Sequence, residues 1–338
     1  MVEGLDRVRV IYLVFAVLAA APVAIYSFSR VRSKKMSLSK LEVLNTFLRV
    51  THKVMPLGFG ALFHVVPSEV SKSNKVTVRM KVPNHLCIGP AGSGGMPLSV
   101  LMSLFDDIST WSCVTSEAKK RPGVSVFLEA KWRATSDGVP PRATILPPGR
   151  EVRIESSMMK RGRQMSFMNI ECRDDKSDEL LAEGRHTKFL PMGFGYEFLF
   201  EHLFPFADLI SKAVGKEGKR NDRLIEGASK KSIMSHIGEL KWSEDKVGVA
   251  EATFKVLPIH KNPMGGMHGG AQSVLAQLAA EELMKGTKVG VKEMNMTYMS
   301  MGKGEVIVEA SQGGSGDVKV TLRRKKGGGV VSEGVFNF

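Results

Sequence analysis

The chain has 338 residues, of which 43% are hydrophobic and 24% are charged, proportions that are typical of a globular protein and exclude a disordered one. Its formal net charge of +14 suits nucleic acid, an anionic membrane surface or a polyanionic ligand. Only 7% of the residues are aromatic, and no basic run is interleaved with stacking aromatics, which argues against nucleic acid as a partner.

The cysteine content indicates the redox environment. Cys87, Cys113 and Cys172 are scattered along the chain with no CxxC pairing. This odd and sparse set predicts a reducing compartment and neither a disulfide framework nor a metal site. No cluster of His, Cys and Asp has the spacing of metal ligands either, so no metal is predicted.

The first predicted element is an apolar run over residues 10–28 that contains no charge. Nineteen helical residues would span roughly 28 Å, close to the hydrocarbon thickness of a bilayer. Basic residues are more numerous after the run than before it, which predicts a cytosolic position for the rest of the chain. The basic residues are Arg7 and Arg9 before the run, and Arg30, Arg32, Lys34 and Lys35 after it.

Residues 1–35 are therefore predicted to form a single-pass membrane anchor. The sequence leaves the membrane open, with mitochondrial, endoplasmic reticulum and peroxisomal membranes among the candidates. A cleavable signal or targeting peptide is the alternative, and the small residues at 19–21 permit it. Pro22 and the weak cleavage pattern argue against a cleaved signal, and the acidic Glu3 and Asp6 argue against a mitochondrial presequence.

The remainder of the chain contains two copies of one pattern, with room for two domains of ordinary size. Each copy has an alternating strand, a glycine-rich stretch, a helical run and then further alternating strands. In the first copy these are 74–80, 89–95, 97–111, 123–132, 151–156, 164–171 and 180–189. In the second they are 245–254, 265–270, a helix beginning near His268, 290–299, 305–310, 318–322 and 330–338.

Alternation of apolar and polar residues predicts half-buried antiparallel strands, so each copy is expected to be an α+β unit. The predicted domains are 36–192 and 233–338. Residues 193–232, which mix an aromatic cluster with polar residues, are predicted to form a helical connector between them.

A polar motif stands at the start of the second helix. Asn262-Pro-Met-Gly-Gly-Met-His268-Gly-Gly is followed at once by an amphipathic run over residues 271–280. The first N–H groups of a helix have no intrahelical partner and carry positive potential, so they can polarise a carbonyl oxygen as an oxyanion hole does. The alternative is a glycine-rich turn whose histidine caps or packs at the beginning of the helix.

This motif, an asparagine followed after five residues by His-Gly-Gly and a long apolar helix, resembles the acyl-CoA thioesterases of the hotdog fold. The resemblance is to the phenylacetyl-CoA-pathway and thioesterase-superfamily-member type. In that family an antiparallel sheet wraps a long helix, and two units pair to build active sites at their interface. The resemblance covers roughly residues 70–190 and 235–338. It implies two fused hotdog domains in this chain, preceded by the transmembrane helix.

The resemblance further implies one composite site. In single-unit relatives an acidic residue lies nine positions after the histidine, on the partner's helix. The second copy has Gln277 at that position, whereas the first copy has Asp106, nine residues after Pro97. The first copy would thus supply the carboxylate, and the second would supply Asn262, His268 and Gly269. The converse site would be dead.

Two further predictions concern the first copy. Helical periodicity places Asp106 at the flank of the apolar face, where burial would raise its pKa and suit a general base, and Asp107 on the exposed side. The resemblance implies that Ser125, on the strand after the helix, helps to hold the attacking water. Lys292 occupies the corresponding position in the second copy.

The implied reaction is hydrolysis of an acyl-CoA thioester to the free acid and CoA. The carbonyl would lie against the Gly269 N–H, with Asn262 and His268 fixing substrate and water. Asp106 would activate water or attack directly to give an anhydride, and the residues do not separate these routes. No cofactor is implied, because CoA is part of the substrate.

The remaining predictions concern binding. Lys160, Arg161 and Arg163 lie at a predicted strand turn and could contact the CoA phosphates, although such turns are often basic for solubility alone. His186 is ambiguous, since a lone histidine in a strand is more often structural. The second candidate function is a catalytically silent acyl-CoA-binding or scaffolding protein that keeps the fold. Double units could also assemble into a homo-oligomer.

Overall fold

The computed structural model describes residues 39–42, 44, 45, 48, 59–63, 65–88, 94–116, 121–133, 146–191, 231–238, 240–243, 247–262, 264–287 and 290–338. Apart from Ser39, these residues belong to one compact unit, Lys40–Phe338. The apolar run 10–28 and residues 193–230 of the predicted connector lie outside the described residues. Within the part that is described, no helix is long and apolar enough to cross a membrane. The anchor therefore stays a prediction.

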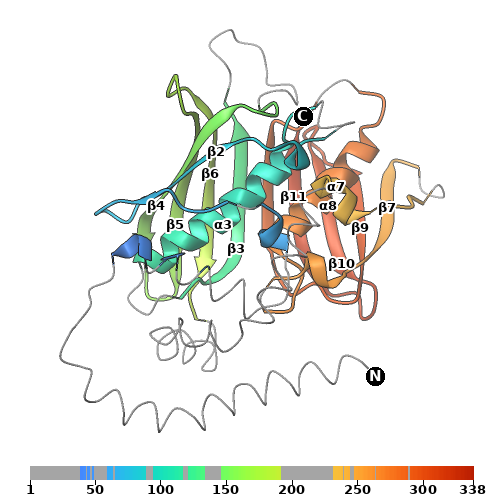
Figure 1. Ribbon diagram of the computed structural model, residues 1–338. Helices are drawn as coiled ribbons and strands as arrows, with labels where there is room; N and C mark the ends of the chain where they lie inside the picture. Colours follow the sequence, from blue (N-terminus) through green and yellow to red (C-terminus); the bar gives the residue numbers. More distant parts are fainter. Residues whose placement is uncertain are drawn as a thin grey trace. The chain divides into compact units, whose positions relative to one another are not determined.

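The described strands form one antiparallel sheet in the order β1-β2-β4-β5-β6-β3-β8-β11-β10-β9-β7 (Figure 1). In the first half the strands are β1 (Glu69–Val70), β2 (Val76–Lys81), β3 (Val124–Trp132), β4 (Glu151–Arg161), β5 (Met165–Asp174) and β6 (Leu180–Phe189). In the second half they are β7 (Val249–Lys255), β8 (Glu293–Tyr298), β9 (Glu305–Gln312), β10 (Val318–Arg324) and β11 (Val330–Asn337). Apart from β1, which was not predicted, these strands lie where the alternating patterns predict them.

Each half of the sheet carries one long helix. The helix α3 (Leu98–Ser116) packs on β3, β4 and β5, and α8 (Gly269–Leu283) packs on β9, β10 and β7 (Figure 1). Shorter helical segments include α7 (Ile233–Ile237) and the 3-10 turns Phe59–Phe63, Asn84–Leu86 and Pro258–His260. A long helix on an antiparallel sheet, present twice, is the hotdog-like α+β arrangement that the sequence predicts.

The two halves repeat the same topology. In space the first half runs β2-β4-β5-β6-β3 and the second half runs β7-β9-β10-β11-β8, so both place the strand after the helix at the centre of the sheet. The two central strands, β3 and β8, pair with each other, from Phe127 opposite Thr297 to Lys131 opposite Glu293. One continuous sheet therefore joins the halves.

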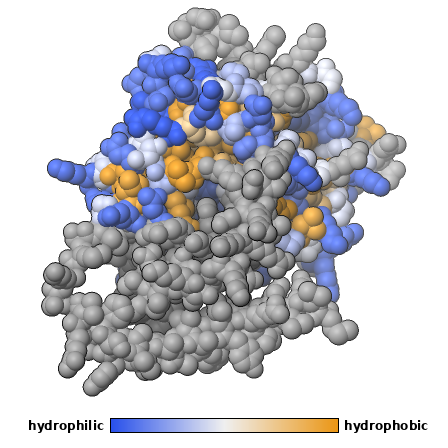
Figure 2. All heavy atoms as spheres, in the orientation of Figure 1, coloured by the Kyte–Doolittle hydropathy of each residue, from blue (hydrophilic) through white to orange (hydrophobic). Residues whose placement is uncertain are grey.

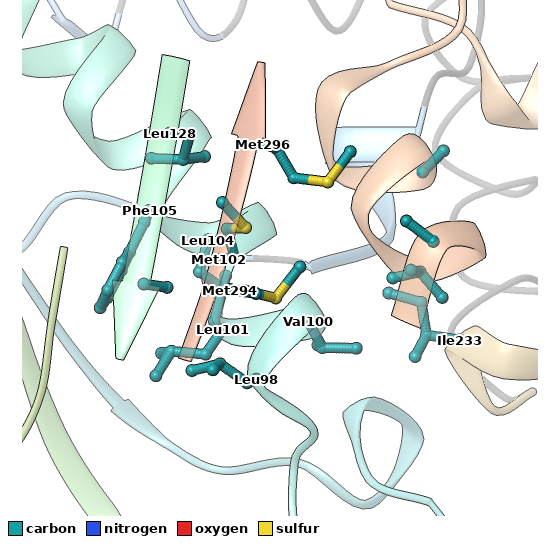
Figure 3. Packing of buried hydrophobic residues seen from close by; sticks show 14 of the residues in the cluster. Leu98, Val100, Leu101, Met102, Leu104, Phe105, Leu128, Ile233, Met294 and Met296 are labelled. Carbon is teal, nitrogen blue, oxygen red and sulfur yellow. The ribbon is translucent and has the colours of Figure 1, made fainter. Parts of the chain in front are cut away.

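The helix α3 is buried almost all round. Sixteen of its nineteen residues are buried, among them Ser103, Asp106 and Ser109. Figure 3 shows its apolar side chains gathered with Leu128 of β3 and with Met294 and Met296 of β8. A helix buried on every side has no fully solvated face, so each polar residue on it needs a partner inside the protein.

Small residues bring α8 close to α3. Four of its buried residues are alanines, at positions 271, 276, 279 and 280. At Gly270 an added Cβ would collide with the side chain of Ser103 on α3. Glycine at this position is thus required by the close crossing of the two helices, which also places the start of α8 against the middle of α3.

Alternation along β6 sends polar residues into this core. Gly184, His186 and Lys188 are buried beneath α3, whereas Arg185 and Phe189 are exposed on the opposite face. Figure 2 shows hydrophilic residues along the margins of one face of the molecule, with apolar residues between them. The inward His186 and Lys188 therefore mark the part of the core that is built for polar chemistry.

Candidate active site

Asp106 lies in the middle of α3 and is only 5% exposed. The Ser125 hydroxyl of β3 donates to its Oδ1 at 2.9 Å, and Lys188 Nζ of β6 lies 3.5 Å from the same oxygen. Lys188 Nζ also donates to Ser125 Oγ at 3.2 Å and to Thr110 Oγ1 at 2.8 Å. Three elements of the first half thus hold one carboxylate in a fixed position.

The pKa of Asp106 differs from the prediction. Burial raises the pKa of Asp106, but the nearby Lys188, His186 and His268 and the Ser125 hydroxyl together hold this pKa well below its ordinary range. The predicted raised pKa is wrong because helical periodicity reveals burial and not a lysine on a strand 82 residues further along. Asp106 is accordingly a carboxylate throughout the neutral range.

The second half contributes the start of α8. His268 is the N-cap residue, and its Nδ1 accepts a hydrogen bond from the Gly270 N–H at 3.0 Å. The Gly269 N–H makes no hydrogen bond with any described residue. An added Cβ on Gly269 would lie 2.7 Å from Asp106 Oδ2, so the carboxylate of one half lies directly against the helix start of the other.

The structure therefore brings together Asp106, Ser125, His268 and Gly269 from the two halves. Asn262 is hydrogen-bonded to the turn before α8 and not to this group. Its Oδ1 accepts from the Met264 N–H at 3.0 Å and from the Gly266 N–H at 3.2 Å, which stabilises the turn that leads into α8. In the described part of the chain Asn262 makes no hydrogen bond with Asp106, Ser125 or His268.

The three basic residues predicted for CoA lie apart from this group. Lys160, Arg161 and Arg163 are exposed at the hairpin between β4 and β5. Arg161 donates to the carbonyl oxygen of Ser116, the last residue of α3, at 3.1 Å. Since Ser116 follows Asp106 by ten residues, the hairpin lies about 15 Å from the carboxylate along the helix axis.

The sequence did not reveal that His186 lies beside the Asp106 carboxylate. The Ser109 hydroxyl lies 2.5 Å from the Phe105 carbonyl oxygen, and the His186 Nδ1 lies 2.6 Å from Ser109 Oγ. Burial and the charge of Lys188 lower the pKa of His186 to about 3. Its Nε2 lies 3.7 Å from Asp106 Oδ1 and makes no hydrogen bond to any described residue.

The His186 Nε2 is fully buried and faces the Asp106 carboxylate inside the core. The structural role favoured for His186 is thus incomplete, because the ring also faces the carboxylate. The alternation of β6, which sends positions 184, 186 and 188 to the same face, is the signal that could have revealed both His186 and Lys188.

Asp107 is the second correction. It was expected on an exposed side of the helix, yet its side chain is only 19% exposed and its Oδ1 lies 3.4 Å from His268 Nε2. The helical wheel fails here because α3 lies between its own sheet and α8, so the face opposite the sheet meets the other half. Within the described segments, no group of three or more His, Cys, Asp or Glu side chains is arranged to hold a metal.

The converse site is closed. Gln277 of α8 occupies the position that corresponds to Asp106, and its Oε1 accepts from the Ser99 N–H at 2.9 Å, at the start of α3. Its Nε2 donates to Glu281 Oε1 at 2.6 Å. Lys292, at the position of Ser125, donates to the carbonyl oxygen of Phe338 at 3.0 Å. The bonded Ser99 N–H corresponds to the Gly270 N–H of the second half, so Gln277 takes here the place that His268 takes there.

Comparison with curated proteins supplies relatives that match just under half of this chain. No protein-family model matches the chain. Acyl-coenzyme A thioesterase 13 of Mus musculus is 26% identical over 154 residues, which are 45% of this chain and 97% of the mouse protein. Acyl-coenzyme A thioesterase 13 of Homo sapiens is also 26% identical, over 157 residues, 46% of this chain and 96% of the human protein. This similarity confirms the resemblance to hotdog-fold acyl-CoA thioesterases.

Solved structures are also similar. Thioesterase superfamily member 2 of zebra fish is 24% identical with a TM-score of 0.36, and the similarity covers 44% of this chain and 98% of that protein. The 12:0-ACP thioesterase of Umbellularia californica is 10% identical with a TM-score of 0.47, covering 79% of this chain and 98% of that protein.

Proposed function

We propose that this chain hydrolyses acyl-CoA thioesters to the free acid and CoA at one composite site between its two halves. The observation that carries the proposal is the position of the Asp106 carboxylate against Gly269 at the start of α8. Thioester hydrolysis needs an oxygen that attacks the carbonyl carbon and a donor that stabilises the developing oxyanion. Asp106 and the Gly269 N–H would fill these two roles.

The residues around Asp106 allow two routes. In one, Asp106 attacks the carbonyl carbon, the C–S bond breaks to release the CoA thiolate, and water then hydrolyses the mixed anhydride. In the other, a water held by Asp106 and Ser125 attacks the carbonyl carbon and passes a proton to the carboxylate, and the C–S bond then breaks to release the CoA thiolate. A carboxylate with a lowered pKa is a weak base, which favours direct attack.

The test is thiol release by the full chain from acyl-CoAs with short, long and aromatic acyl groups. We expect turnover in the unmodified chain and a loss of roughly 10²- to 10⁴-fold in Asp106→Asn, which keeps the shape but removes the attacking charge. Asp175→Asn, which alters an exposed ion pair with Arg79, is the control and should keep full activity. Retained turnover in Asp106→Asn would exclude this site.

A catalytically silent acyl-CoA-binding protein is the second candidate, and the closed site at Gln277 is the observation that favours it. A chain that had already converted one of two equivalent sites to a structural contact could have lost chemistry at the other as well. Saturable acyl-CoA binding without thiol release in the unmodified chain would support this candidate against the enzyme. Turnover of thioesters on another carrier would instead change only the substrate class.

The proposal extends to binding and location. The exposed Lys160, Arg161 and Arg163 would contact the CoA phosphates, because the pantetheine arm separates these phosphates from the reacting sulfur. Replacing all three with Gln should raise KM for acyl-CoA with little change in kcat. Residues 10–28 would anchor the protein with its catalytic part in the cytosol. Release of the protein from membranes after deletion of residues 1–35 would support the anchor, and light scattering would reveal a homo-oligomer.

A further inference from the structure

His268 is held at both ring nitrogens. Its Nδ1 accepts from the Gly270 N–H at 3.0 Å, so this nitrogen carries no proton. Its Nε2 lies 3.4 Å from Asp107 Oδ1, and a carboxylate accepts hydrogen bonds and cannot donate them when ionised. Both contacts are satisfied by one form of the ring only, the neutral tautomer that carries its proton on Nε2.

Asp107 is enclosed on the side away from His268. The 3-10 turn Phe59–Phe63 covers it so closely that an added Cβ on Gly60 would lie 2.9 Å from Asp107 Oδ2. The Phe59 ring stacks near the imidazole, with ring centroids 5.9 Å apart. No lysine or arginine among the described residues forms an ion pair with Asp107. Its charged partner in this part of the chain is His268.

We propose that Asp107 is a positioning residue for the thioesterase site, an inference that rests on the function proposed above. The Asp107 carboxylate holds the Nε2–H of His268, which leaves Nδ1 bare to cap the Gly270 N–H. With the cap in place, the preceding Gly269 N–H remains directed toward the substrate carbonyl. The other tautomer would set the Nδ1–H against the Gly270 N–H, two donors facing each other, and the first turn of α8 would have to rearrange.

The surroundings of His268 give this inference a pH dependence. Burial alone lowers the pKa of His268, but the hydrogen bond and charge of Asp107, with the charge of Asp106, raise it above its ordinary value, while Lys188 opposes them. Protonation adds a proton to Nδ1 and removes the cap. Activity should therefore fall as the pH drops through the pKa of His268, and removing the charge of Asp107 should move that fall to lower pH.

The experiment compares Asp107→Asn and Asp107→Ala with the unmodified full chain, and Asp175→Asn serves as a control for the same chemical change at an exposed ion pair. Two readouts are needed, namely the pH profile of kcat/KM for acyl-CoA and the ¹⁵N NMR shifts of the histidine rings. The His268 signal is assigned by its loss in His268→Gln. The NMR readout reports tautomer and pKa without any need for turnover.

We expect the unmodified chain to show His268 as the Nε2–H tautomer. Asp107→Ala should show mixed tautomers and a kcat/KM lower by about ten- to a hundredfold, comparable to the loss of other partners that orient a functional imidazole. Asp107→Asn should keep the tautomer, because its amide oxygen still accepts from Nε2–H, and it should shift the acid limb to lower pH. An unchanged tautomer and pH profile in Asp107→Ala would overturn the inference.

The outcomes separate this inference from the proposed function. If the unmodified chain releases no thiol from any acyl-CoA while His268 loses its tautomer in Asp107→Ala, the thioesterase proposal fails and the Asp107–His268 pairing stands. If the chain turns over acyl-CoA and His268 is an Nδ1–H tautomer in the unmodified protein, the function stands and the role of Asp107 is refuted.

Discussion

The starts of α8 and α3 occupy equivalent positions in the two halves, yet their backbone donors are used differently. At α8 the imidazole of His268 caps the Gly270 N–H from within the same turn, and the neighbouring Gly269 faces Asp106 of the other half. At α3 the side chain of Gln277, from the other half, itself takes the Ser99 N–H. The second N–H of each helix is thus capped in both halves, from within its own turn at α8 and from the opposite half at α3.

The residues beneath the two helix crossings also differ between the halves. The strands β6 and β11 both contain Glu-Gly, at 183–184 and 333–334, so their later residues can be compared directly. His186 and Lys188 of β6 correspond to Phe336 and Phe338 of β11, which pack in or against the apolar core. A carboxylate at position 277 would therefore have no histidine or lysine of β11 beneath it. Asp106 and its β6 partners are thus present together in one half, and their counterparts in the other half are a glutamine and two phenylalanines.

Replacing the cation should have the largest effect on this comparison. In Lys188→Met the carboxylate of Asp106 stays buried without its ammonium partner, and we expect a loss of about 3–5 kcal/mol in the free energy of unfolding at pH 7. The pKa of Asp106 lies below its unfolded value of about 3.9, so its ionised form stabilises the native state above that pH, and this stabilisation is lost as the pH falls through the lowered pKa.

In the variant, burial would instead raise the pKa of Asp106, so the deficit should shrink as the pH falls toward 4 and the carboxylate gains a proton. Urea unfolding at several pH values measures this. Lys131→Met, which removes an ion pair with Glu183 on the other face of the sheet, is the matched control and should cost less than about 1 kcal/mol. Equal losses from the two substitutions, independent of pH, would show that Lys188 only fills space.

Gly269→Ala tests the close approach of the Asp106 carboxylate to the start of α8. In Gly269→Ala the added methyl would lie 2.7 Å from Asp106 Oδ2 and 3.3 Å from the ring of Tyr298, so the halves must move apart locally. A displacement of about 1 Å between reacting groups can lower activity by about a hundredfold, and we expect kcat/KM to fall by that order. Gly314→Ala, where an added Cβ meets no atom within 4 Å, should leave kcat/KM unchanged.

The smallest effect is expected at the closed crossing. Gln277→Ala leaves the buried Ser99 N–H without its acceptor, which should lower the free energy of unfolding by about 1–3 kcal/mol and leave kcat/KM as it is. Gln164→Ala, at an exposed position, is the control for loss of an amide alone. A large loss of turnover in Gln277→Ala would mean that the closed crossing takes part in the chemistry after all.

Much of the fold could be predicted from the sequence because strand alternation and helix-start motifs are local features of the chain. Alternation along single strands, such as Leu180–Phe189, is preserved whatever the strand packs against, and the motif around His268 marks the helix start by itself. Asp106 and Ser125 were expected from the resemblance to the hotdog-fold family, and the structure places the Ser125 hydroxyl 2.9 Å from the Asp106 carboxylate.

The rest depends on contacts between distant segments. Lys188 meets Asp106 only because β6 lies beneath α3, and Asp107 meets His268 only because α8 crosses the opposite face. A helical wheel assumes that one side of the helix faces solvent and the other faces the core. This assumption fails for a helix that is enclosed by two halves of the protein. The direction of the Asp106 pKa was missed for the same reason, since burial is readable from the pattern and the opposing charges are not.

The pairing of β3 with β8 has a consequence for how this protein can change over generations. In a dimer of identical units, every substitution arises twice, so a glutamine that closes one active site closes its twin as well. Here a single gene encodes both units, and the backbone ladder from Phe127 to Lys131 keeps them in register whatever their side chains do. Selection can then act on the two copies separately. One helix crossing can be kept for chemistry while the other becomes a structural contact between the halves.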